Sequence, residues 1–400
     1  MMSKYAGNII VMKIILTAFI FGMIVLTINL LDYPKQTVNV VFLIALSILI
    51  NGFSQIFYSI FQAHEKMEYQ SLCSVLYNTL LLMGALFAIS KKFDVVGFAL
   101  LYFIVSALVF GVVFIIFIWK FILPKMEIDL SFWKPVLKET LPFAISGISI
   151  SIYVWIDTIM LSLLKGEEVV GWYNAAYRIV LVLVFIPVIF RSSMFPLMSQ
   201  FYVSSQEKLR LYFEKMLKIM IFISLPLGVG TVFISDKVIL LVYGRQFIHS
   251  IIALQILIWS LVLIFSRCTF ECLLESVNRQ AVVTKIFIIG TLFNVSANLL
   301  LIPKYSYIGA GIVTVITDII VLVFLVTAAK NIGYSLSKGF SVDVIKIIFA
   351  SVVMGIFLKG VMNLRLILLI TSCVIIYVLI SLVLKVINKD DILLVKSIFR

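Results

Sequence analysis

The stretch VVGFALLYFIVSALVFGVVFIIFIW, residues 95–119, decides the fold class of this 400-residue chain. It holds 25 residues without one charged side chain, whereas crossing a hydrocarbon layer about 30 Å thick takes about 20 helical residues. Backbone groups in lipid find no water, so they must be bonded within a helix. The stretch therefore predicts a membrane-spanning α-helix.

Eleven further apolar runs of similar length lie along the chain. Apolar residues make up 63% of the sequence and charged residues 13%, about half the ~25% charge of a soluble domain. Twelve spans leave only short loops, so we predict an all-α, polytopic membrane protein of about 12 transmembrane helices without a separate soluble domain. The predicted spans are 12–31, 38–62, 70–90, 95–119, 141–164, 172–196, 214–234, 248–275, 281–302, 306–329, 344–362 and 366–387.

This composition excludes a secreted disulfide scaffold, a Rossmann enzyme and a nucleic-acid-binding module. The net charge of +13 is typical of a membrane protein whose Lys and Arg gather in cytoplasmic loops. All four cysteines lie in apolar runs, and the pair Cys268 and Cys272 on one helix does not make a zinc site. We therefore expect no metal and no cofactor.

The distribution of basic residues predicts the orientation. When residues near a span end are counted with the adjoining loop, the N-terminus, every second loop and the C-terminus hold 20 Lys and Arg, and the other six loops hold 9. The richer set belongs on the cytoplasmic side. We expect both termini in the cytoplasm and the protein in the cell (plasma) membrane.

The chain also repeats itself. The turn FQAHEKMEYQ (61–70) aligns with LESVNRQAVV (274–283), so that Lys66 matches Arg279. Gly97 follows Lys66 by 31 residues and Gly309 follows Arg279 by 30, and both glycines open an apolar run. Repeats of this kind are typical of transporters that hold substrate between the repeated units.

Several strings resemble the polysaccharide (O-antigen type) flippases of the multidrug/oligosaccharidyl-lipid/polysaccharide exporter superfamily. Their order and spacing carry the resemblance, which is most specific between residues 141 and 318. The strings are LPFAISGISISIYVWIDTIMLS (141–162), VGWYNAAYRI (170–179), LVYGRQF (241–247), NRQ (278–280) and PKYSYIGAGIVTVITD (303–318), with FQAHEKMEYQ (61–70) as a weaker match.

The resemblance implies two six-helix lobes around a central polar cavity, followed by two further helices. This chain departs from that pattern at its start, where two helices of the first lobe are absent, in agreement with the shorter first repeat. We therefore expect a first lobe over residues 1–122, a second over 123–330 and two additional spans over 331–400.

By the same resemblance, we expect a transporter that flips a polyprenyl-linked oligosaccharide to the outer leaflet for surface polysaccharide synthesis, and not an enzyme. The expected partners are the lipid-linked oligosaccharide, membrane lipids and a polysaccharide polymerase or glycosyltransferases; nucleic acid is not expected. Three alternatives stay open. They are an ion-coupled small-molecule exporter of the same superfamily, a membrane polysaccharide polymerase or ligase, and an inactive truncated fragment.

Charges within the spans are the candidate functional residues, because a charge in hydrocarbon is costly and tends to mark a pathway. Asp157 and Arg178 lie at matching depths, about 10–12 Å from the outer ends of adjacent spans. We expect them either to form an ion pair that joins the two spans or to face the cavity. In the cavity, Arg178 is a candidate for binding pyrophosphate and Asp157 for binding a coupling ion.

Arg191 and Arg267 lie toward the inner ends of their spans. A guanidinium binds phosphate oxygens in a bidentate manner, so both are candidates for the pyrophosphate of the substrate. The alternatives are snorkelling to headgroups and, for Arg267, an internal pair with Glu271 four residues on. Asp318, near the middle of its span, is either a structural carboxyl or the carrier of a proton or sodium ion.

Overall fold

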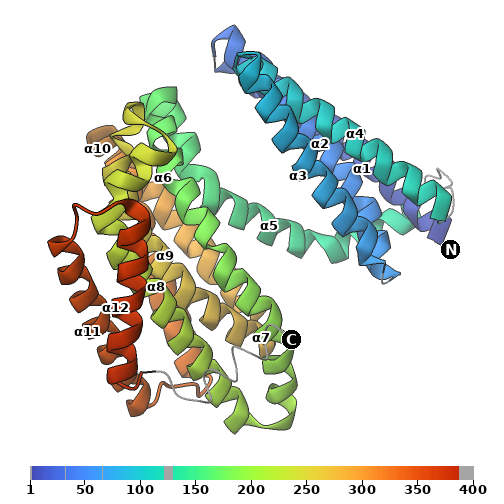
Figure 1. The fold of residues 1–400 in the computed structure, drawn as a ribbon. Helices are drawn as coiled ribbons and strands as arrows, with labels where there is room; N and C mark the ends of the chain where they lie inside the picture. Colours follow the sequence, from blue (N-terminus) through green and yellow to red (C-terminus); the bar gives the residue numbers. More distant parts are fainter. Residues whose placement is uncertain (1, 32, 65, 121–128, 387–400) are drawn as a thin grey trace. The chain divides into compact units, whose positions relative to one another are not determined.

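The computed structural model describes residues 2–31, 33–64, 66–120 and 129–386. Over these residues it is all-helical, with one short 3-10 turn and no strand, which confirms the predicted fold class (Figure 1). The helices are α1 (Met2–Leu30), α2 (Lys35–Ala63), α3 (Met67–Ser90), α4 (Val95–Lys120), α5 (Leu130–Lys165), α6 (Glu167–Leu183), α7 (Phe185–Ser204), α8 (Gln206–Val242), α9 (Ser250–Ser276), α10 (Gln280–Asn331), α11 (Lys338–Gly360) and α12 (Leu366–Val383).

Eleven segments among the described residues are long and apolar enough to cross a membrane. α6 and α7 together form one of them, and α10 is a 52-residue element that covers two predicted spans, 281–302 and 306–329. With α10 counted as two crossings, the helices correspond to the twelve spans predicted from the sequence.

Two breaks divide the longest helical segments. Pro187 has no N–H to donate to the carbonyl of Leu183, and α6 ends at that residue. α10 breaks at Ser306, where the backbone φ is 54°. A Cβ at the repeat landmark Gly309 would lie 2.7 Å from the carbonyl oxygen of Leu301. Glycine at this position therefore allows the chain to pass the break.

The chain forms two compact units, Met1–Pro142 and Phe143–Arg400. The first unit contains α1 to α4 and the beginning of α5. Within it α2 packs against α4, and a polar contact joins the two helices, since the Ser47 and Ser106 hydroxyls lie 2.7 Å apart. The predicted division of the lobes at 122/123 and 330/331 stays a prediction. The core of the first unit includes Phe57, Phe61, Cys73, Val105, Val109, Val113 and Phe117.

In the second unit α9 packs against α6, α7, α8 and α10, so it is covered on most sides. α11 and α12 pack against each other and against α8. Polar contacts fix this pair at both ends of α8. Lys218 pairs with Asp343 at 2.9 Å, and Lys237 donates to the carbonyls of Met362 at 2.5 Å and Leu364 at 2.7 Å. The helix pair is thus bound to α8 and does not lie free on the unit.

Candidate functional site

Three charged residues of α9 share one helix face because they stand four residues apart: Arg267, Glu271 and Glu275. Neighbouring helices cover α9, so the side chains of Arg267 and Glu271 are only 12% and 10% exposed, while that of Glu275 is 23% exposed. Arg267 Nε lies 3.0 Å from Glu271 Oε1, an ion pair within one helix. Both atoms are buried, and the contact lacks hydrogen-bond alignment. Its attraction is therefore mainly between the two charges.

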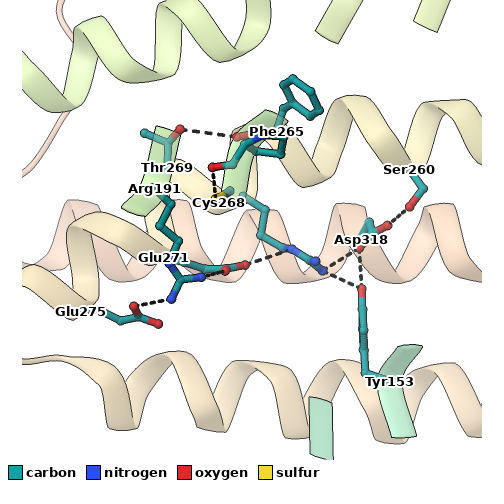
Figure 2. Close-up of polar contacts among 11 residues, drawn as sticks. Tyr153, Arg191, Ser260, Phe265, Cys268, Thr269, Glu271, Glu275 and Asp318 are labelled. Carbon is teal, nitrogen blue, oxygen red and sulfur yellow. Dashed lines mark hydrogen bonds and ion pairs between the residues drawn. The ribbon is translucent and has the colours of Figure 1, made fainter. Parts of the chain in front are cut away.

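Asp318 on α10 is the second partner of Arg267. Its Oδ1 accepts from Arg267 Nη1 at 2.8 Å and from the Tyr153 hydroxyl at 2.5 Å, and its Oδ2 accepts from the Ser260 hydroxyl (Figure 2). The Asp318 side chain is 1% exposed. The Arg267 guanidinium also lies 5.3 Å from the ring centre of Tyr153 and 5.0 Å from that of Phe287. The contact joins α5, α9 and α10 through one guanidinium.

Arg191 on α7 extends the contacts toward the end of α9. Its Nη1 donates to Glu271 at 3.1 Å and its Nη2 to Glu275 at 2.5 Å. The result is a row of alternating charges, Glu275, Arg191, Glu271, Arg267 and Asp318, which we call the charge ladder (Figure 2). It contains three carboxylates and two arginines. The Arg191 side chain is 35% exposed and that of Arg267 12%, so the ladder becomes drier toward Asp318.

The helix break before α7 positions Arg191. α7 begins at Phe185, and Arg191 stands one turn after Pro187, so the side chain points from the new helix toward α9. The Cys268 thiol donates to the carbonyl of Pro187 at 3.6 Å and fixes the break against α9. The helix break thus places Arg191 where it can reach Glu271 and Glu275 on α9.

A second polar group lies around Asp157 on α5. The buried carboxylate accepts from the Tyr173 hydroxyl at 2.8 Å, the Thr314 hydroxyl at 2.5 Å and Asn298 Nδ2 at 2.5 Å. Asn298 Nδ2 also donates to Asn294 at 2.9 Å. Asn298 Oδ1 is buried and has no hydrogen-bond partner among the described residues. A carboxyl group, a hydroxyl and an amide oxygen without a hydrogen-bond partner among the described residues thus belong to one buried group.

The expected contact between Asp157 and Arg178 is wrong. Asp157 is satisfied by neutral donors from α6 and α10, while Arg178 is exposed and forms no ion pair with a described residue. The reason is the helical period. Tyr173 and Tyr177 are buried on one face of α6, and Arg178 stands about 140° around the helix from Tyr173 at about 100° per residue. Asp157 and Arg178 lie at similar depths along their helices, but Arg178 lies on a face of α6 that does not point toward Asp157.

The structure brings Arg191, Arg267, Glu271 and Asp318 into one network and leaves Arg178 and Asp157 outside it. The sequence interpretation missed several members of the two groups. The spacing in the sequence could have identified them, because each missed residue stands four positions from a candidate residue or from another polar residue in an apolar span. The missed residues are Tyr153 before Asp157, Glu275 after Glu271, and the pair Asn294 and Asn298.

The described residues contain no group of three or more His, Cys, Asp or Glu side chains placed to hold a metal ion together. The four cysteines are buried and unbridged. In the group around Asp157, Asn298 Oδ1 is a buried acceptor without a hydrogen-bond partner among the described residues, and oxygen ligands suit hard cations. Glu271 Oε1 in the charge ladder also lacks a hydrogen bond, but it lies 3.0 Å from the Arg267 guanidinium, which disfavours a cation there.

Two family models match the chain. The model described as polysaccharide biosynthesis protein matches residues 1–202, half of the chain, and the model MatE matches residues 142–300. The two matches overlap around α5, α6 and α7, where Asp157, Arg178 and Arg191 lie.

The chain is similar to several proteins of other organisms. It is 28% identical over 169 residues to the "Probable flippase AglR" of Haloferax volcanii, a match that covers 41% of this chain and 35% of that protein. It is 25% identical over 335 residues to the "Capsular polysaccharide biosynthesis protein CapF" of Staphylococcus aureus, with 80% and 81% covered. The matched segment thus spans about a third of the archaeal relative.

Among solved structures, the chain resembles "Lipid II flippase MurJ, inward closed conformation". The TM-score is 0.80 at 17% identity, with 98% of this chain and 84% of that chain covered. At this identity the likeness establishes the fold alone.

Proposed function

Because this chain belongs to the polysaccharide biosynthesis protein family, we propose that it flips a polyprenyl-linked oligosaccharide from the cytoplasmic to the outer leaflet for surface polysaccharide synthesis. Support comes from relatives whose names describe flippases or capsular polysaccharide biosynthesis and from the fold of the lipid II flippase. The proposed mechanism is alternating access, in which the pyrophosphate is held by a cation and the lipid tail stays in the bilayer.

The proposal rests mainly on the exposure of Arg178 and on its lack of an ion-pair partner among the described residues. Arg178 lies eleven residues after the start of α6, about 17 Å along the helix, so its charge falls at membrane depth. It is exposed and has no ion-pair partner among the described residues. A guanidinium at this depth needs an anion or water, and the pyrophosphate of a lipid-linked sugar fits its bidentate geometry.

The other two arginines receive different roles. Arg267 is engaged by Glu271 and Asp318 and is 12% exposed, so we assign it to the architecture of the unit and not to substrate. Arg191 is 35% exposed, and we propose it as a secondary contact that can exchange Glu275 for phosphate oxygens. Arg178 then stands first among the three candidates for the pyrophosphate.

For coupling, we propose that the group around Asp157 holds a monovalent cation. Asp157, the Thr314 hydroxyl and the unpartnered Asn298 Oδ1 would supply its oxygen ligands. A bound cation would neutralise the one buried carboxylate of the two groups that has no arginine beside it. Asp318 and Glu271, both paired with Arg267, are weaker candidates.

The placement in the membrane is part of the proposal. The uneven distribution of Lys and Arg supports a plasma-membrane protein with both termini in the cytoplasm. A polysaccharide polymerase or glycosyltransferases would act beside it, and the chain itself would perform no chemistry on the glycan. An ion-coupled small-molecule exporter is the second candidate, favoured by the MatE match over residues 142–300.

The test uses cells that rely on this chain for surface polysaccharide. Arg178→Gln removes the charge and the guanidinium fork, and Arg178→Lys keeps the charge but loses the fork. Surface polysaccharide should fall in the order wild type, Lys, Gln, by about tenfold or more for Gln if charge-assisted hydrogen bonds to phosphate are lost.

Arg245→Gln is the matched control, because Arg245 is another exposed arginine of the second unit, in the 3-10 turn Arg245–Phe247. Membrane levels of all variants are compared by immunoblot. Normal surface polysaccharide from Arg178→Gln at normal protein level would remove Arg178 from the mechanism. Export of a cationic drug without any effect on surface polysaccharide would favour the second candidate.

A further inference from the structure

Three interhelix turns of the second unit border an open cavity of about 480 Å³. They are the turns between α7 and α8, between α9 and α10, and between α10 and α11. The predicted orientation puts all three on the cytoplasmic side. The proposed transport function does not use this cavity. It is lined by Tyr202, Gln206, Val277, Arg279, Asn331, Ile332 and Tyr334.

The turn between α9 and α10 is held in one conformation. Asn278 has a backbone φ of 60°, and the next N–H, that of Arg279, donates to the carbonyl of Leu274 at 2.8 Å. Asn adopts this left-handed conformation more readily than most residues. The NRQ string found in the sequence, residues 278–280, thus forms a rigid corner that carries Arg279 at the cavity.

The turn between α10 and α11 is fixed as well. Gly333 has a φ of 93°, which leads Tyr334 back to α8, where its hydroxyl donates to Gln206 Oε1. Burial raises the pKa of Tyr334, so this hydroxyl keeps its proton and remains a donor. Ser337 adds two contacts to Glu214 at 2.8 and 2.9 Å. The cavity walls are therefore tied together before any ligand arrives.

The lining favours an anion. Arg279 is the one charged residue that lines the cavity; it is exposed and has no ion pair with a described residue. Asn331 adds a side-chain amide, while the Gln206 amide, which donates to the carbonyl of Tyr202 at 2.9 Å, keeps one further N–H. The adjoining sequence adds the basic residues Lys208, Arg210 and Lys330 and the acids Glu207 and Glu275, and Glu275 is paired with Arg191 at 2.5 Å.

We propose that this cavity binds the phosphate group of a ligand, either the headgroup of an anionic lipid or a soluble phosphate compound. A guanidinium with amide donors beside it is the usual way to recognise phosphate oxygens. Basic pockets between helices at the cytoplasmic surface are suited to lipid headgroups. The cavity lies at the end of α9 that carries Glu275, so an occupied cavity would stand next to the outermost pair of the charge ladder.

The experiment titrates the purified full-length chain in detergent with two probes. Dihexanoyl phosphatidylglycerol represents the lipid source and inorganic pyrophosphate the soluble source, with dihexanoyl phosphatidylcholine as the uncharged reference. Binding is followed by microscale thermophoresis. We expect Arg279→Gln to weaken binding of at least one anionic probe by about tenfold or more, the loss of a charge-assisted contact. Binding of phosphatidylglycerol that Arg279→Gln weakens would identify a headgroup site. Binding of pyrophosphate that Arg279→Gln weakens would identify a site for a soluble compound, and binding that Arg279→Gln leaves unchanged would belong to the Arg178 site and would count against this cavity.

Arg245→Gln, an exposed arginine in another turn, is the control for loss of surface charge and should bind like the wild type. Asn331→Asp should also weaken binding, because it puts a carboxylate at the cavity without changing its size. Monodisperse gel filtration shows that each variant is folded. Equal affinities for Arg279→Gln and Arg245→Gln, or no binding of either anionic probe by the wild type, would overturn the proposal.

Discussion

Breaking the charge ladder at Arg267 should destabilise the second unit more than removing its partner Asp318. Arg267→Met leaves Asp318, 1% exposed, with only neutral donors from Tyr153 and Ser260. An unpaired buried charge of this kind costs about 3–5 kcal/mol. Asp318→Asn leaves Arg267 beside Glu271 at 3.0 Å, so the expected cost is that of weakened charged hydrogen bonds, about 1–3 kcal/mol.

The double variant Arg267→Met/Asp318→Asn removes both charges of the pair. Its loss should be smaller than the sum of the two single losses, because the second substitution no longer leaves a charge without a partner. The double variant should even be more stable than Arg267→Met alone. Glu271 keeps its contact with Arg191 in all three variants, so the rest of the ladder remains.

The assay is thermal denaturation in detergent, followed by the fraction that still elutes as a monodisperse peak after heating. The expected order of midpoints, from high to low, is wild type, Asp318→Asn, the double variant and Arg267→Met. Arg245→Met controls for loss of an exposed arginine and should stay near the wild type. An additive loss in the double variant, or a lower midpoint for Asp318→Asn than for Arg267→Met, would refute the reasoning.

Two further predictions concern orientation and the cation. In a variant without the four native cysteines, Lys134→Cys should react with an impermeant thiol reagent only after the cells are opened, and Arg245→Cys in intact cells; the reverse pattern would invert the orientation. Sodium chloride, compared with N-methylglucamine chloride, should raise the thermal midpoint of the wild type and of Asp318→Asn but not of Asp157→Asn, and an equal rise in all three would exclude Asp157 as the cation site.

The fold followed closely from the sequence because the bilayer dictates it. An apolar run long enough to cross lipid has one way to satisfy its backbone, and the twelve predicted runs correspond to the helices found. The extent of the helices was harder to predict. α5 begins at Leu130 and α8 ends at Val242, both beyond the apolar runs, because helices continue through polar residues at the surface. The break within α10 was easier to predict, because the apolar runs 281–302 and 306–329 are separated by the segment that contains Pro303, and the backbone leaves the helical conformation at Ser306.

The candidate site was only partly predictable, for a different physical reason. A charged residue within an apolar span is energetically costly and therefore rare, so Arg267, Glu271 and Asp318 could be recognised from the sequence. The partners across helices depend on rotation about each helix axis, which hydropathy does not specify when a span is apolar all round. Neutral hydrogen-bond donors are even harder to recognise from the sequence than charged residues. Tyr173, which donates to Asp157, looks like an ordinary member of an apolar span, whereas Asn298 could have been found from its spacing of four residues to Asn294.

The charge ladder and Arg178 are expected to have different roles in the second unit: the ladder holds helices together, and Arg178 binds the substrate. The ladder joins α7, α9 and α10, and Tyr153 adds α5, so bending one of these helices away from the others would separate buried opposite charges. Separating Arg267 from Asp318, whose side chains are 12% and 1% exposed, costs about 3–5 kcal/mol, far more than thermal energy provides. The pairs of Arg191, which is 35% exposed, are partly screened by solvent and contribute less. The unit is therefore expected to move as one body during transport. A charge that must bind and release a substrate in each cycle cannot be held by such pairs, and Arg178, exposed and unpaired among the described residues, meets that requirement.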